Sequence, residues 1–349
     1  MRRGLISLSA VELPSAVLDA RLGRVRAAMQ EAPFDALVIY TNIARPAAVS
    51  WLTGFVPYWS EAVLVMPRGG GTVLVAALSF RVKTWIERVS LIGDIVHTPR
   101  IGLKAAETIA AMQRDAAVGV VDLEGLPNGV FDDLREGGPG LKIGDASEPF
   151  AALRAKADPA EIALAHKAAA IAREALAEMQ GGTSGAIIAG VERRARLLGA
   201  EEIHVAVAPD LDRDWRFKRV EGEVPMGSSF ALRASVAYKG TWVRLVRTVG
   251  EGALARQAAE GLARAVAQLP ESRGFAGFRS WLVEGCRLAQ PLDPLLGMPY
   301  AGRHEPLPGA LVSVQGALAI DGRTVPVGAP ALIGAPGEAA SLLIDPLYE

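Results

Sequence analysis

The chain has 349 residues and a formal net charge of −1; half of the residues are apolar and 21% are charged. This length suits two domains, and the balanced charge predicts no binding to nucleic acid or to an anionic membrane surface. No stretch is long and apolar enough to cross a membrane, and the first residues lack the apolar run of a secretory signal. Because the only cysteine is Cys286, no internal disulfide can form, and we expect a cytoplasmic protein.

The first 150 residues alternate between helical and strand patterns, which is typical of an α/β domain. A turn rich in glycine at 67–71 separates two apolar runs and predicts a hairpin. The expected elements are helices over 21–31 and 83–89 and strands over 35–40, 62–66, 72–76 and 117–122.

A long helix is predicted to begin at Pro159, because Asp158 is placed to cap it and Glu161 completes a capping box. We place a domain boundary at the entry to this helix, with domains over residues 1–152 and 153–349. The second domain is expected to hold further helices over 187–198, 253–268 and 278–288 and strands over 204–207, 230–238, 241–249, 311–320 and 326–333.

Eight short motifs occur in an order and at a spacing that match a known family. They are DALVI (35–39), WLTGF (51–55), LRAKADPAEI (153–162), GS (227–228), YKGTW (238–242), RT (247–248), HEP (304–306) and PG (308–309). Together they resemble the creatinase and Xaa-Pro aminopeptidase (prolidase) family of metallopeptidases. The resemblance implies a small N-terminal α/β domain of the creatinase type followed by an α+β domain of the pita-bread type, assembled as a homodimer.

The family's peptidases hold two metal ions with two aspartates, a histidine and two glutamates. The matching positions in this chain are occupied by Arg233, Arg244, Gly297, Gln315 and Gly328. Arginine has no lone pair to offer a metal and keeps its positive charge, and glycine has no side chain to coordinate with. The resemblance therefore implies a degenerate member that needs no metal or other cofactor.

Two arginines in place of two carboxylates reverse the charge of the former metal pocket. If Lys239 and Gly240 form a two-residue hairpin turn, Ser235 lies opposite Arg244, and Arg233 shares its face as a diagonal neighbour. One interpretation is a site for an anionic ligand, clamped by Arg233 and Arg244. The alternative is that each arginine pairs with a carboxylate of the chain or points outward.

Three further residues complete the predicted site. Gln315 can give a ligand a hydrogen bond without charge. His304 and Glu305 are the surviving residues of catalytic type, and the resemblance implies that the histidine contacts substrate. The alternatives are a structural role for His304 and, for Glu305, a salt bridge to Arg303 or to an arginine of the pocket.

The first functional hypothesis is a metal-independent protein, without peptidase activity, that binds a small anionic or carboxylate-bearing ligand in the former metal pocket. If it is an enzyme, we expect a hydrolase or lyase that acts on a small molecule. The alternative is a pseudoenzyme that serves as a peptide or protein interaction module. A conventional Xaa-Pro metallopeptidase would require these alignments to be wrong at several positions.

Overall fold

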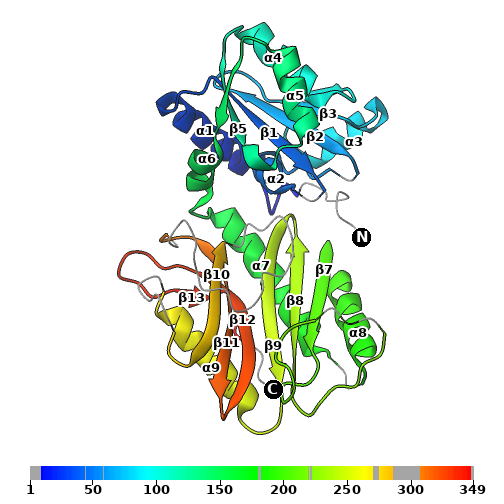
Figure 1. The fold of residues 1–349 in the computed structure, drawn as a ribbon, viewed down its shortest axis with the longest axis vertical. Coiled ribbons are helices and arrows are strands. Elements are labelled where there is room, and N and C mark those ends of the chain that lie inside the picture. The colour runs from blue at the N-terminus through cyan, green and yellow to red at the C-terminus, as the bar shows by residue number, and fades with distance from the viewer. Residues whose placement is uncertain are drawn as a thin grey trace. The chain divides into compact units, whose positions relative to one another are not determined.

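The computed structural model describes residues 9–43, 45–57, 59–179, 182–218, 220, 222–269, 275–285 and 307–346. The chain divides into two compact units between Arg154 and Ala155 (Figure 1). Within the described parts of the chain, no helix combines the length and the hydropathy of a membrane span.

The N-terminal unit is built on one mixed sheet of six strands in the order β4-β3-β2-β1-β5-β6. The antiparallel pairs are β1 with β2 and β2 with β3, and the remaining pairs are parallel. The strands are β1 (Ala36–Asn42), β2 (Glu61–Pro67), β3 (Val73–Ala76), β4 (Asp94–His97), β5 (Ala117–Val121) and β6 (Lys142–Asp145).

Helices cover both faces of this sheet, and strand β1 shows why. Its side chains alternate, so that Leu37 and Ile39 pack in one apolar core while Ala36 and Val38 pack in another. A sheet buried on both faces needs apolar residues at successive strand positions, as β1 has from Ala36 to Ile39. The first core is closed by helices α1 (Ser15–Glu31), α2 (Ala47–Thr53), α3 (Lys83–Val89) and α6 (Ser147–Arg154), and the second by α4 (Ile101–Met112) and α5 (Asn128–Gly137).

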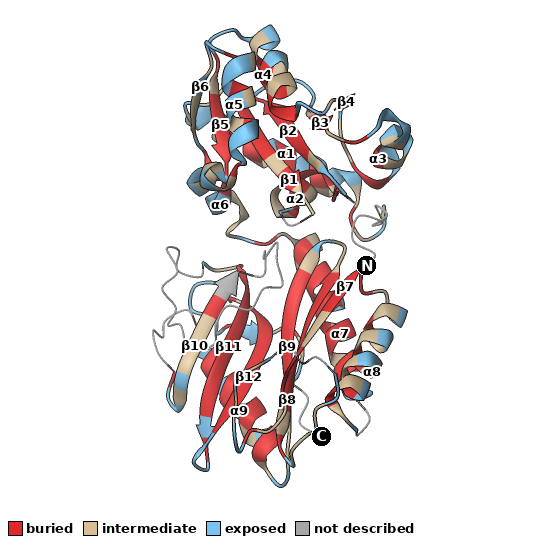
Figure 2. Ribbon diagram, turned by 45° about the vertical axis from the view of Figure 1, so that its right-hand side comes forward, coloured by how far each residue is buried: buried red, intermediate tan, exposed pale blue. Residues whose placement is uncertain are grey.

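The C-terminal unit has two antiparallel sheets around a single apolar core, and Figure 2 shows their strands largely buried. One sheet holds β7 (Glu202–Ala208), β8 (Phe230–Tyr238) and β9 (Thr241–Val249). The other holds β10 (Phe278–Gly285), β11 (Leu311–Ile320), β12 (Arg323–Leu332) and β13 (Ser341–Leu342). The helices are α7 (Pro159–Ala177), α8 (Ser184–Leu197) and α9 (Leu254–Ala267).

Two polar contacts tie this core together. Thr248 on β9 donates its hydroxyl to the carbonyl of Pro326 on β12 at 3.0 Å, which joins the two sheets. The partly buried guanidinium of Arg247 donates to the carbonyl of Leu176 at the end of α7, and this loss of solvent lowers the pKa of Arg247. Because Arg247 points toward α7, the residues next to it in the strand point away from that helix.

Most of the predicted elements are confirmed, including the capping box of Asp158 and Glu161 at the start of α7. The predicted helix over 278–288 is wrong: its described part is the strand β10, paired with β11. Phe278, Trp281 and Leu282 have the spacing of a helix face, but a short apolar run fits either structure until its partner is known. The sequence patterns also missed α2, α4, α5, α6, β4, β6 and β13.

Candidate functional site

The hairpin of β8 and β9 places the two arginines as the sequence predicts. Lys239 and Gly240 form the turn with positive φ angles of 47° and 75°, and Ser235 pairs with Arg244 across the strands. Arg233 pairs with Val246 and lies two residues before Ser235, so both arginines project from one face. This face, called here the arginine face, is the one turned away from α7.

Both arginines are deeply buried. Arg233 is 2% exposed and Arg244 is 3% exposed, although the sheet around them is mainly apolar. The guanidinium carbon of Arg233 lies 4.6 Å from the ring centroid of Phe217, a cation–π contact. Both residues also make further contacts within the protein. The arginine face is therefore a built, positively charged interior surface rather than a solvated one.

Strand β7 adds a polar row to the same face. His204 pairs in register with Ser235, which in turn pairs with Arg244. The His204 ring stacks on Trp242 with centroids 5.9 Å apart, and its Nε2 lies 3.9 Å from a carboxylate oxygen of the buried Glu202. The histidine side chain is 41% exposed, so it is the accessible end of this row.

Gln315 lies on the second sheet, directly opposite Gly328. Its amide nitrogen donates to Ser313 Oγ at 3.1 Å and to the carbonyl of Val314 at 3.0 Å, while its buried Oε1 accepts no hydrogen bond from the described residues. A Cβ built on Gly328 would lie 2.5 Å from three atoms of the Gln315 amide. Gln315 thus fills the space that a side chain at position 328 would need.

These residues do not fit a metal ion. Arg233 and Arg244 are positively charged, Gln315 packs against Gly328, and the described residues hold no group of three histidine, cysteine, aspartate or glutamate side chains suited to a metal. The predicted site residues His304 and Glu305 lie outside the described residues, as does Gly297. Of the predicted ligand residues, the structure brings Arg233 and Arg244 together, and Gln315 makes its hydrogen bonds to Ser313 and Val314 instead of to either arginine.

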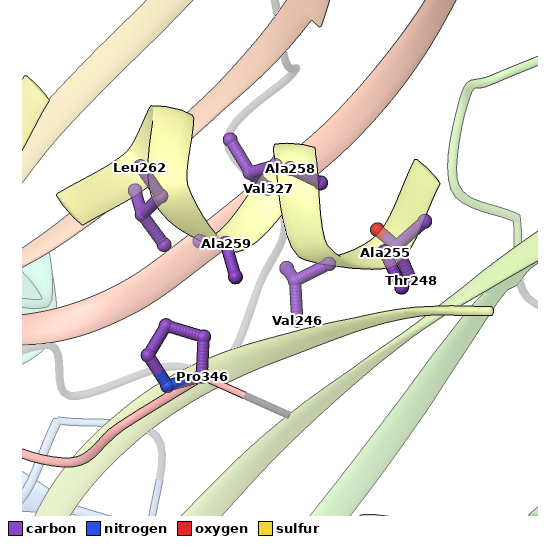
Figure 3. Close-up of a pocket in the computed structure, with 9 residues that line it drawn as sticks. Val246, Thr248, Ala255, Ala258, Ala259, Leu262, Val327 and Pro346 are labelled. Atoms are coloured by element: carbon purple, nitrogen blue, oxygen red, sulfur yellow. The ribbon is translucent and has the colours of Figure 1, made fainter. Parts of the chain in front are cut away.

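A hollow of about 220 Å³, open solvent included, lies between α9 and the strands β9 and β12 (Figure 3). Thr248 and Gly328 contribute to it, and the rest of its lining is apolar: Val246, Ala255, Ala258, Ala259, Leu262, Val327 and Pro346. No charged side chain lines this hollow, so it has no group that would attract an anion.

Sequence reasoning missed Phe217 as the neighbour of Arg233. Phe217 lies in the segment 210–218, in which most residues are charged. The sequence did offer one signal, which is that Phe217 follows strand β7 closely. If the chain turns back beside β7, its side chains alternate between the two faces of the sheet, and every second one points to the arginine face.

Comparisons with known proteins agree with this architecture. Residues 21–156 match the family model described as the creatinase/prolidase N-terminal domain. A search of curated proteins found no match.

Solved structures match almost the whole chain. The prolidase from Pyrococcus horikoshii is similar with a TM-score of 0.69 and 15% identity, covering 95% of this chain and 99% of that one. The X-Pro aminopeptidase from Thermotoga maritima has a TM-score of 0.70 and 14% identity, covering 93% and 99%. The N-terminal domain of the FACT complex subunit SPT16 from Eremothecium gossypii has a TM-score of 0.63 and 14% identity, covering 96% and 97%. At these identities the likeness shows a shared fold.

Proposed function

We propose that this chain, a creatinase/prolidase family member by its N-terminal domain and its fold, binds a small carboxylate-bearing anion on the arginine face. No metal takes part in this binding. The family's peptidases need two metal ions, whereas the matching positions of this chain carry two positive arginines, two glycines without a side chain and one neutral glutamine. We therefore also propose that the chain is not a metallopeptidase.

The burial of two like charges on one face is the observation that carries this proposal. The planar N–H donors of a guanidinium group match a carboxylate in geometry, and each arginine has five such donors, so it can bind a ligand beside the contacts that it makes within the protein. A buried anion there would interact with both charges in an environment of low dielectric, where the attraction is stronger than in water. Arg233 and Arg244 are the proposed clamp.

Polar neighbours of the clamp support a ligand with more than one functional group. The unbonded Oε1 of Gln315 favours a ligand that brings a hydrogen-bond donor, because a buried acceptor left without one costs about 1–3 kcal/mol. His304 and Glu305 complete the proposal on sequence grounds alone, as residues that would act on the ligand if the protein is an enzyme. Such an enzyme would be a hydrolase or a lyase.

The second candidate is an interaction module without catalytic activity. The stacking of Phe217 on Arg233 favours it, since a closed face leaves little room for a ligand. In this case the arginines would serve to hold the domain together, and a peptide or a partner protein would bind on another surface. For either candidate we propose a homodimer in the cytoplasm, as the sequence predicts.

The experiment that separates the candidates is a binding titration of the purified full chain with acetate, succinate and inorganic phosphate. A ligand present at about one hundred times its dissociation constant adds roughly 2.7 kcal/mol of stability, which a thermal-shift assay detects. We expect carboxylates to stabilise the chain, and manganese, zinc and chelator to leave it unchanged.

Substitutions then locate the binding. R233M and R244M remove one charge each and keep a long apolar side chain, and R213M serves as the control because the side chain of Arg213 is 87% exposed. We expect each of the first two to weaken carboxylate binding at least tenfold, and R213M to leave it unchanged. Carboxylate binding that survives in R233M and R244M would overturn the clamp, and no response to any anion would favour the interaction module.

A further inference from the structure

The segment that follows β7 turns back and pairs with the edge of that strand. Val207 and Lys218 exchange two backbone hydrogen bonds, of 2.9 and 2.8 Å. Lys218 therefore shares the face of Val207, and its neighbour Phe217 projects to the opposite face. That opposite face is the arginine face, because Ala206 pairs with Arg233.

Small residues let the Phe217 ring reach across β7. Ala206 and Ala208 lie on the arginine face of β7, beyond His204, and they pair with Arg233 and Ala231. With only methyl groups there, the ring can lie over the strand and meet the Arg233 guanidinium at 4.6 Å. A larger side chain at either alanine would occupy the path of the ring.

Ion pairs hold the segment in this position. Asp214 lies 2.8 Å from Arg216 and 2.9 Å from Lys218, and the hydrogen bonds from these two side chains lower the pKa of Asp214. Asp212 pairs with Arg323 at the start of β12, at 2.7 Å. The Asp212 ion pair before Phe217 and the backbone pairing of Lys218 after it thus attach the segment on both sides of Phe217.

We infer that Phe217 is a positioning residue for the proposed anion site, an inference that rests on the proposed function. A ring stacked on one face of a guanidinium fixes the plane of that group and keeps water from the covered face. The contact with Phe217 restricts how the Arg233 guanidinium can rotate, and Arg244 is its diagonal neighbour on the same face. An anion between the two arginines then meets donors that are already oriented, which lowers the entropic cost of binding.

The test separates the aromatic ring from its bulk. F217Y keeps the aromatic face, F217L keeps most of the apolar volume, and F230L is the matched control because Phe230 lies on the opposite face of β8. Succinate affinity is measured by calorimetry on the full chain. We expect F217L to weaken binding about 5- to 30-fold, the loss of one partly buried cation–π contact, and F217Y and F230L to stay within about twofold of the wild type.

A second readout does not depend on any ligand. In protein labelled with ¹⁵N-arginine, the Nε–H signal of Arg233, assigned by its absence in R233M, should exchange slowly with solvent in the wild type and in F217Y. In F217L it should exchange faster by at least tenfold, since the ring no longer covers the group. If the wild type binds no succinate, the proposed function fails and this signal alone decides the role of Phe217. Equal exchange and equal affinity in F217L and F217Y would overturn the inference.

Discussion

Glu201 gives the C-terminal unit a dependence on pH that can be worked out from the structure. Its side chain is buried beside the β8–β9 turn, where a carboxylate oxygen accepts the N–H of Gly240 at 3.1 Å. Burial is the main cause that raises the pKa of Glu201 from 4.5 to about 7, and the hydrogen bond from Gly240 only partly opposes it.

The sign of the effect follows from where the proton is held. Between pH 4.5 and 7 the folded state keeps this proton while the unfolded state has lost it, so raising the pH favours unfolding. The stabilisation is fully present below about pH 4.5 and is lost by about pH 7. The raised pKa of Glu201 corresponds to a change of about 3 kcal/mol in the free energy of unfolding, because one pKa unit is worth about 1.4 kcal/mol.

Replacing Glu201 with glutamine removes the titration and keeps an oxygen that can accept from Gly240. We expect E201Q to match the wild type at pH 4.5 and to be more stable by up to about 3 kcal/mol at pH 8. The measurement is hydrogen exchange of peptides from β8 and β9 as a function of urea at each pH, since it reports on this unit alone. Other carboxyl groups titrate in both proteins and cancel in the difference.

The control is E260Q, the same substitution at a glutamate that is 57% exposed and lies 3.9 Å from Arg264. The free energy of unfolding of E260Q should stay within about 0.5 kcal/mol of the wild-type value from pH 4.5 to 8. If the free energies of unfolding of E201Q and the wild type differ by the same amount at every pH in this range, the assignment of the pH dependence to Glu201 is refuted.

Three further substitutions test the packing. Gly328→Ala should cost about 1–3 kcal/mol, because its Cβ would lie 2.5 Å from the Gln315 amide, and adding Gln315→Ala should recover part of this loss in a double-mutant cycle. Arg21→Ala should lower the stability of the N-terminal unit by about 2 kcal/mol in urea unfolding. It removes a buried 2.8 Å hydrogen bond to the carbonyl of Trp51 and a cation–π contact with the Trp51 ring. Arg21→Lys should recover less than half of this loss. Asp158→Ala should cost about 1 kcal/mol in thermal unfolding through the loss of the α7 cap, and Asp158→Asn should restore most of it.

The candidate site divides into parts that local sequence determines and parts that it does not. The pairing of Arg233 and Arg244 on one face could be predicted because it depends only on the two-residue turn and on the alternation of side chains along two adjacent strands. His304 and Glu305 were predicted from the resemblance and lie outside the described residues, so their place in the site stays a prediction.

The sequence by itself determined those elements whose signals are local: the capped start of α7 and the β8–β9 hairpin. The tertiary structure decided that residues 278–285 form a strand, that Gln315 packs over Gly328 and that Phe217 covers Arg233. The physical reason is the range of the interactions. A cap or a tight turn is settled by residues within a few positions of each other, whereas a cross-strand partner or a stacked ring is supplied by a distant segment whose position only the folded chain fixes.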